Sequence, residues 1–260
     1  MDEQTRFSPI PATSAPKITS PAASASSILE HKRYRMPRET LDRQIHHLQD
    51  EVLLLGSMVE QAMLESVNAL KAQDVETARR IFHADHLINE KRYAIENAIL
   101  ILIATQQPMA RDLRMLAAIL EVITELERMG DYAKGIAKVT MRLESSIDFA
   151  NMRDFSTMAE LAVDMLHRAL SAFFAENAQQ AYDIPKEDDA VDELYNKIYR
   201  ALVAYMIANP ESIDQANFLM WVAHNIERMA DRVTNICERT VFIATGELLE
   251  MDADDEEETE

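Results

Sequence analysis

Residues 125–136 read ELERMGDYAKGI, and residues 225–236 read NIERMADRVTNI. The two stretches share the frame Glu-Arg-Met-(Gly or Ala)-Asp at the same spacing. Each stretch puts two carboxylates four residues apart, and like charges at that spacing repel on a helix by roughly 0.2–0.5 kcal/mol. The recurrence of this unfavourable pair of carboxylates indicates a duplicated unit in which a cationic group faces each pair.

The composition favours an all-helical protein. The chain has 260 residues, of which 48% are apolar and 27% charged, and this is enough to bury a sizeable core. It has only 4 glycines, 8 prolines and 6% aromatic residues. Such a composition suits helices and is poor in the turn residues that many strands would require.

The formal net charge is -19, and eight of the acidic side chains lie in residues 250–260. An acidic surface repels phosphate backbones, so we expect no nucleic-acid partner, whereas metal cations and basic protein faces remain open. The single cysteine, Cys237, cannot form an internal disulfide. No apolar run approaches the roughly 20 residues that span a bilayer, and no secretory signal is evident. We therefore expect a cytoplasmic protein.

Apolar periodicity predicts an all-α fold of two tandem three-helix bundles with six long antiparallel helices. The expected helices cover residues 40–71, 74–105, 109–147, 152–180, 185–208 and 211–245. The expected organisation is a disordered N-terminal extension (1–38), a first bundle (39–148), a second bundle (149–247) and an acidic disordered tail (248–260).

The two bundles align as repeats. Asp85 aligns with Asp188 at an offset of 103 residues, and Glu127 aligns with Glu227 at an offset of 100. The two offsets differ because the second repeat is three residues shorter in the connection between its second and third helices, where a bundle tolerates a deletion. The chain is thus expected to be a tandem duplication of a three-helix unit.

Paired polar residues lie on the apolar side of two helices in each unit. At about 100° per residue, Glu127 and Asp131 fall on the same side of their helix as its leucines. The same reasoning places the pairs on the preceding helix beside an apolar stripe. We expect both pairs of each unit to face the interior groove. The candidate residues are Asp85, Asn89, Glu127 and Asp131 in the first unit and Asp188, Asp192, Glu227 and Asp231 in the second.

Such clusters need compensation, and the sequence leaves two answers open. Arg92, Arg128 and Arg228 could form ion pairs with the carboxylates between helices. Alternatively, the all-oxygen donor set could hold a hard cation such as Fe, Mn, Mg or Ca in preference to Zn.

Signatures of catalysis are missing from the sequence. It contains no His-Glu-x-x-His, no Glu-x-x-His of the di-iron type, no glycine-rich phosphate loop and no Gly-x-Ser-x-Gly. We therefore expect the protein not to be an enzyme.

Three motifs resemble one known family. They are Asp85-x-x-Ile-Asn89, Gln107-Pro-Met-Ala-Arg-Asp-Leu-Arg114 and Leu126-Glu-Arg-Met-Gly-Asp131. The first and third recur as Asp188-x-x-Val-Asp192 and as Ile226-Glu-Arg-Met-Ala-Asp231, which continues to Asn235-Ile-x-Glu238. Over residues 41–246 the chain is similar to the PhoU family of phosphate-transport accessory regulators.

The resemblance implies a homodimer of two tandem bundles that acts as a negative regulator of phosphate uptake and phosphate-starvation signalling. It implies two partners, the ATP-binding subunit of the phosphate ABC transporter and the sensor histidine kinase of the phosphate regulon. The protein would be cytoplasmic and recruited to the inner membrane through these partners. It also implies multinuclear metal clusters, of iron first and of Mn, Mg or Zn as alternatives, held by the eight residues named above.

Two residues depart from the family pattern. Asn89 replaces a carboxylate and should weaken cation binding in the first unit, and Ala230 replaces the glycine found at position 130. Two alternatives to a regulator stay open: an enzyme that depends on metal and carboxylates, and a structural helical adapter without metal.

Overall fold

A computed structural model describes residues 23–143 and 152–251, with side chains from residue 39 onward. The described residues are helical, with no strand among them. The chain divides into a unit of residues 1–40 and a compact unit of residues 41–260. The elements are α1 (Ala23–Ala72), α2 (Val75–Gln106), α3 (Ala110–Thr140), α4 (Met152–Phe174), α5 (Ala178–Asp183), η1 (Pro185–Glu187), α6 (Asp188–Ala208), η2 (Pro210–Ser212) and α7 (Ile213–Thr245).

The expected all-α fold with six long helices is confirmed, and two expected ends are corrected. Helix α1 begins at Ala23, so residues 23–38 of the segment expected to be disordered are helical. Alanine and leucine are good helix formers, and Pro21 stands just before the helix. Helix α3 ends at Thr140 rather than at residue 147, and residues 141–143 are not helical. Residues 144–147 of that expected helix, like residues 1–22 and most of the acidic tail, lie outside the described residues.

The helix expected over residues 152–180 is two helices. Helix α4 ends at Phe174, and the chain turns through Glu176, whose φ of 51° is left-handed. Asn177 then caps the short α5, because its side-chain oxygen accepts a hydrogen bond from the backbone N–H of Gln180. A left-handed residue followed by a capping asparagine stops one helix and starts another.

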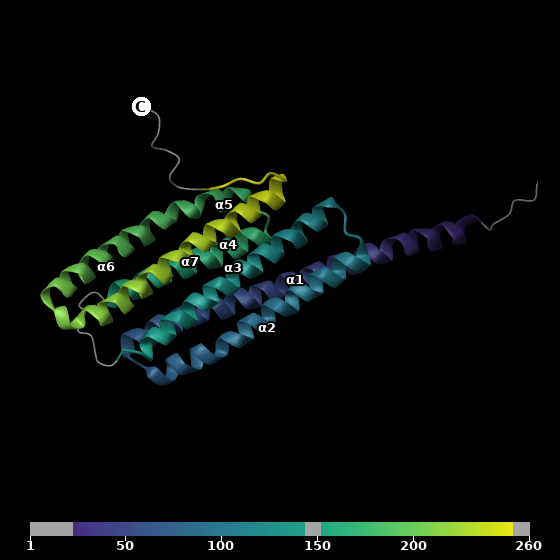
Figure 1. Cartoon of the computed structure of the whole chain (residues 1–260). Helices are drawn as coiled ribbons and strands as arrows, with labels where there is room; N and C mark the ends of the chain where they lie inside the picture. Colours follow the sequence, from purple (N-terminus) through teal and green to yellow (C-terminus); the bar gives the residue numbers. More distant parts are fainter. Residues whose placement is uncertain (1–22, 144–151, 252–260) are drawn as a thin grey trace, which may run out of the picture. The chain divides into compact units, whose positions relative to one another are not determined.

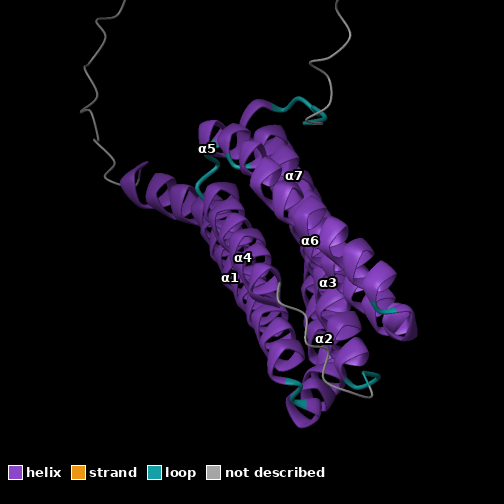
Figure 2. Cartoon of the chain, turned by 90° about the vertical axis from the view of Figure 1, so that its left-hand side faces the viewer, coloured by secondary structure: helices purple, strands orange, loops and turns teal. Residues whose placement is uncertain are grey.

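The two repeats share one hydrophobic core instead of forming separate compact units. Val59 and Ile119 of the first repeat belong to the same buried cluster as Phe173 and Ile226 of the second. Figures 1 and 2 show the long helices of this unit running side by side. No helix in the described part of the chain is long and apolar enough to cross a membrane.

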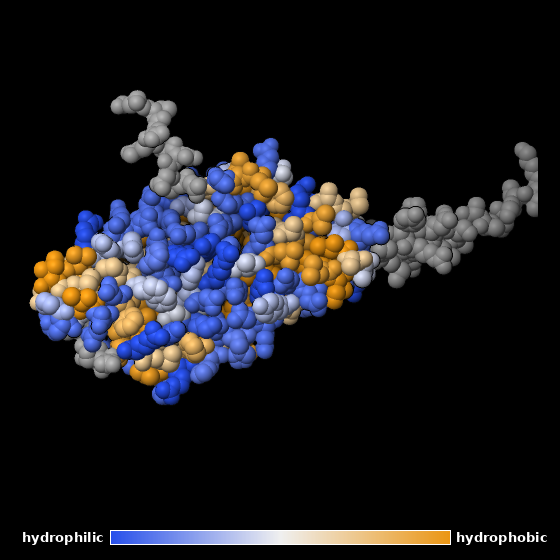
Figure 3. Space-filling view, in the orientation of Figure 1, coloured by the Kyte–Doolittle hydropathy of each residue, from blue (hydrophilic) through white to orange (hydrophobic). Residues whose placement is uncertain are grey.

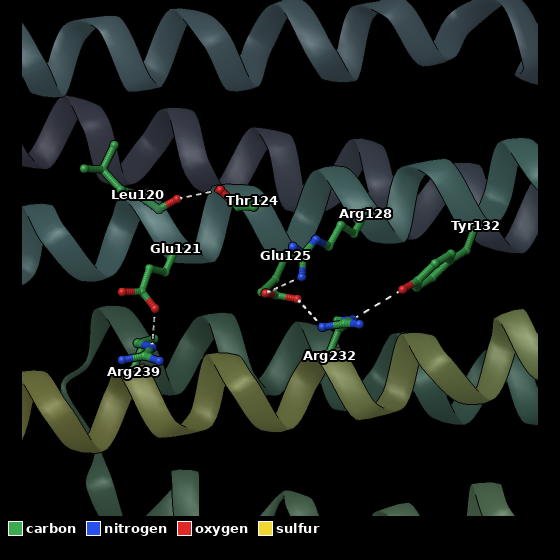
Figure 4. A network of polar contacts seen from close by, with 8 residues as sticks. All are labelled: Leu120, Glu121, Thr124, Glu125, Arg128, Tyr132, Arg232 and Arg239. Carbon is green, nitrogen blue, oxygen red and sulfur yellow. Dashed lines mark hydrogen bonds and ion pairs between the residues drawn. The ribbon is translucent and has the colours of Figure 1, made fainter. Parts of the chain in front are cut away.

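Helices α3 and α7 pack against each other and join the repeats, and a polar network crosses their contact (Figure 4). Arg232 of α7 donates to the hydroxyl of Tyr132 at 3.3 Å and lies 3.5 Å from Glu125 Oε2. Further along, Arg239 Nε is 2.7 Å from Glu121 Oε2. Rising residue numbers on α7 meet falling numbers on α3, so the two helices are antiparallel.

Replacing Arg232 by methionine should lower the free energy of unfolding by about 1–3 kcal/mol, because it leaves the largely buried Glu125 poorly compensated. Glu125 has a side chain only 14% exposed, whereas Glu121, the partner of Arg239, is 54% exposed. Arg239→Met is the matched control and should cost at most about 1 kcal/mol. Urea denaturation of both variants measures the difference, and equal losses would contradict the prediction.

Candidate functional site

The first predicted quartet lies between α2 and α3. Helix α2 carries Asp85, which is only 5% exposed, and Asn89, whose amide donates to Asp85 Oδ2 at 3.2 Å. Helix α3 carries Glu127, partly buried, and Asp131, which is exposed. Asp131 and Asp85 both act on the pKa of Glu127, so the structure brings the carboxylates into one electrostatic cluster.

A lysine compensates this cluster. Lys134 Nζ donates to Asp85 Oδ2 at 2.7 Å and lies 3.5 Å from Asp131 Oδ1. It also lies 5.9 Å from the centre of the Phe82 ring, within the range of a cation–π contact. The hydrogen bond to Asp85 raises the pKa of Lys134, which keeps the ammonium charged. Lys134 was not among the residues predicted from the sequence, although its position three residues after Asp131 was the available signal.

The arginines expected to neutralise the quartets make their closest contacts elsewhere. Arg92 pairs with Glu96 at 3.0 Å, and Arg128 lies 3.4 Å from Glu125. Arg228 lies over the ring of Tyr132, 5.0 Å from its centre. The ion-pair hypothesis is therefore corrected: these arginines act on the carboxylates only at longer range.

Burial raises the pKa of Glu127, and the negative charges of Asp131 and Asp85 raise it further. The positive charges of Arg92 and Arg128 oppose this rise in the pKa. The first quartet is thus acidic but has several cations nearby.

The second quartet lies between α6 and α7 and is more strongly perturbed. Burial and then the charges of Asp192, Asp231 and Glu227 raise the pKa of Asp188 to about 7. Burial and then Asp231 and Asp192 raise the pKa of Glu227 to about 7, against the opposing charge of Arg228. Carboxylates crowded in this way cannot all ionise at little cost near neutral pH.

Two oxygens of the second quartet are buried without a hydrogen-bond partner. They are Asp188 Oδ1 and Glu227 Oε2. His224 Nδ1 lies 3.1 Å from Glu227 Oε2 but makes no hydrogen bond to it. Unsatisfied buried oxygens are costly, and they indicate a place for a donor or a cation.

The prediction that every member of the quartets faces inward is wrong for three carboxylates. Asp131, Asp192 and Asp231 are exposed. Residues four apart on a helix are about 40° apart around its axis, so one member of a pair can face the groove while the other lies at its rim.

The second quartet fits a hard cation by its chemistry, although its side chains have not converged. Within residues 39–143 and 152–251, no three His, Cys, Asp or Glu side chains are gathered so as to hold a metal ion as they stand. The donors are nevertheless all carboxylate oxygens, the ligands that hard cations prefer, and two of them lack partners. Binding requires the carboxylates to turn toward a common point, which their repulsion opposes until a cation is present.

A duplicated three-helix unit with an acidic cluster between its second and third helices defines a class of tandem helical-repeat proteins. The chain belongs to the PhoU family, because the family model described as PhoU domain matches it twice, at residues 52–140 and 155–240. The confirmed resemblance covers both motif helices of both repeats.

Named relatives and solved structures agree with this membership. The chain is 33% identical to the phosphate-specific transport system accessory protein PhoU homolog of Clostridium acetobutylicum, over 83% of this chain and 99% of that protein. It is 32% identical to the phosphate-specific transport system accessory protein PhoU of Escherichia coli, over 78% and 85% of the two chains. The crystal structure of the phosphate transport system regulatory protein PhoU from Streptococcus pneumoniae matches with a TM-score of 0.74 and 33% identity, covering 80% of this chain and 99% of that one.

The raised pKa values near 7 predict an unusual dependence of stability on pH. A carboxyl group whose pKa is higher in the folded than in the unfolded chain binds more protons when folded, so stability falls as pH rises between the two pKa values. We expect the stability of the Glu227→Gln variant to fall less than that of the wild type between about pH 4.5 and pH 7. Above pH 7 the variant should be more stable than the wild type. Urea denaturation in the presence of a chelator measures it.

His224 Nδ1 lies 3.1 Å from Glu227 Oε2, so an effect through this side chain needs its own control. Glu227→Gln should therefore be compared with the wild type in a His224→Gln background as well. A pH dependence that is identical with and without the Glu227 carboxyl group would contradict the prediction.

Proposed function

We propose that this protein is a non-enzymatic negative regulator of phosphate uptake and phosphate-starvation signalling in a bacterium. The observation that carries the proposal is the similarity to accessory proteins of the phosphate-specific transport system, which extends over 99% of the Clostridium acetobutylicum relative. A shared fold alone would not carry a function. Here both repeats and both acidic motifs are also present.

The protein acts by contact with two partners, the ATP-binding subunit of the phosphate ABC transporter and the sensor histidine kinase. It joins them when phosphate is plentiful and keeps the kinase in its signal-off state. Through these contacts it is held at the inner membrane, and it works as a homodimer.

Exposed apolar side chains support a role in protein contacts. Near the connection from α2 to α3, Leu100, Ile101, Met109 and Leu113 are 43–68% exposed. Figure 3 shows apolar residues gathered over this end of α2 and α3. Long helices with exposed apolar residues offer surfaces on which the helices of a partner can pack.

A metal ion or cluster bound between α6 and α7 is the second part of the proposal. Asp188, Asp192, Glu227 and Asp231 would hold it, and their oxygen donors favour iron, manganese or magnesium over zinc. The cation would neutralise carboxylates whose pKa values are raised by burial and mutual repulsion, and it would tie the two helices together. The family resemblance implies metal binding by the first quartet as well, but there Lys134 already donates a hydrogen bond to Asp85.

The carboxyl groups with pKa values of about 7 also favour a second candidate function. Groups that titrate near neutral pH are suited to general acid–base catalysis. An enzyme that depends on metal and carboxylates would hydrolyse phosphate esters and lose this turnover in Glu227→Gln.

Deleting the gene from its host should raise alkaline phosphatase activity in phosphate-rich medium, because the kinase is no longer kept in its signal-off state. The wild-type gene supplied on a plasmid should restore low activity, and an empty plasmid should not. Low activity in the deletion strain would contradict the regulatory function.

Protein purified without chelator should contain iron or manganese, and Glu227→Gln should lose most of it, because the variant removes a donor and a charge from the quartet. Glu247→Gln removes an exposed charge outside the quartet and is the matched control. Elemental analysis of the three proteins measures the metal content. Equal content in both variants would contradict the site, and a folded wild type without metal would favour the structural adapter.

A further inference from the structure

The two quartets differ in where the positive charges around them stand. The offset of 100 residues in the motif helices places Thr234 where the first repeat has Lys134. The offset of 103 residues in the preceding helices places Tyr195 where the first repeat has Arg92. The second repeat has cations of its own at other positions: Arg232 stands where the first repeat has Tyr132, and His224 where it has Thr124.

The two quartets also differ in their number of carboxylates. Asn89 of the first repeat corresponds to Asp192 of the second, so the second quartet has one more carboxylate. Arg232, His224 and Arg228 oppose the rise in the pKa of Asp231, but Thr234 leaves the position of Lys134 uncharged. The Phe82 ring near the Lys134 ammonium corresponds to Pro185, which offers no aromatic face. The aromatic neighbour of the lysine, and not the lysine alone, is therefore specific to the first repeat.

Lys134 occupies the place where a cation would be needed in the first repeat. Its Nζ atom lies 2.7 Å from Asp85 Oδ2 and 3.5 Å from Asp131 Oδ1, so it bridges the two helices that carry the quartet. Asp85 Oδ2 also accepts the hydrogen bond from Asn89. No oxygen of this quartet is among the buried side-chain atoms without a hydrogen-bond partner in the described part of the chain.

The second repeat has the opposite pattern. Asp188, the counterpart of Asp85, has a buried oxygen without a hydrogen-bond partner, and so does Glu227, the counterpart of Glu127. A metal ion entering the second quartet would satisfy these oxygens. In the first quartet it would have to displace an ammonium group that is already hydrogen bonded, or bind beside it against charge repulsion.

We propose that Lys134 is a built-in counter-cation that keeps metal out of the first repeat, so that this chain binds metal only between α6 and α7. This inference rests on the proposed metal binding of the second quartet. Lys134 acts as a residue that determines which of the two repeats takes metal.

Titrating the full chain with Mn²⁺ tests the assignment, after bound metal has been stripped with a chelator. The free ion is counted by electron paramagnetic resonance. Glu227→Gln should weaken Mn²⁺ binding by about tenfold or more, whereas Glu127→Gln, the same change in the other repeat, should leave binding unchanged. Equal weakening by the two variants would overturn the proposal.

Exchanging the residues at the equivalent positions tests the lysine itself. Lys134→Thr should open the first quartet and roughly double the Mn²⁺ bound per chain, and the added binding should disappear when Glu127→Gln is combined with it. A folded Lys134→Thr protein that binds no more Mn²⁺ than the wild type would overturn the role of Lys134 while leaving the metal site of the second repeat intact.

The reverse exchange covers the case in which Lys134→Thr does not fold. Thr234→Lys should place an ammonium group beside Asp188 and abolish Mn²⁺ binding by the second quartet, with helicity by circular dichroism unchanged. Undiminished Mn²⁺ binding in this variant would overturn the proposal. If neither the wild type nor Lys134→Thr binds Mn²⁺, the metal part of the proposed function fails and this inference fails with it.

Discussion

Helices α3 and α7 lie antiparallel against each other, and each carries one copy of the repeated motif. The apolar side of these helices packs in the shared core through buried residues such as Met129 and Ile226. The motif carboxylates are therefore restricted to the flanks that face α2 in one repeat and α6 in the other. Both acidic clusters and the union of the repeats depend on this pair of helices.

The repeats have diverged under two different physical constraints. Packing constrains volume: Gly130 lies so close to Ile88 that a Cβ atom would come within 3.1 Å of it, whereas Ala230 has the smaller Val191 at the equivalent position. Close-packed interiors require such compensation. Charge is less constrained at the rim of a cluster, where water and nearby side chains can compensate it. One repeat therefore compensates its acids internally, and the other leaves two buried oxygens unsatisfied.

Most of the fold was predictable because helices depend on local periodicity. The spacing of apolar residues and the recurrence of Glu-Arg-Met-x-Asp were sufficient to predict six long helices in two repeats. The errors lie where a local conformation changes the path of the chain, as at the left-handed Glu176, which ends α4 near residues expected to be helical. Single-residue turns of this kind have little periodic signal.

The sequence by itself determined the duplication, the helical class, and the presence of paired carboxylates on the second and third helices of each repeat, since all of these follow from spacing along the chain. Only the tertiary structure decided which cation faces which pair. Lys134 of α3 reaches Asp85 of α2, and residues that far apart in sequence meet only through packing. The structure also decided that Asp188 and Glu227 carry pKa values of about 7, because burial and the approach of other charges depend on three-dimensional distance.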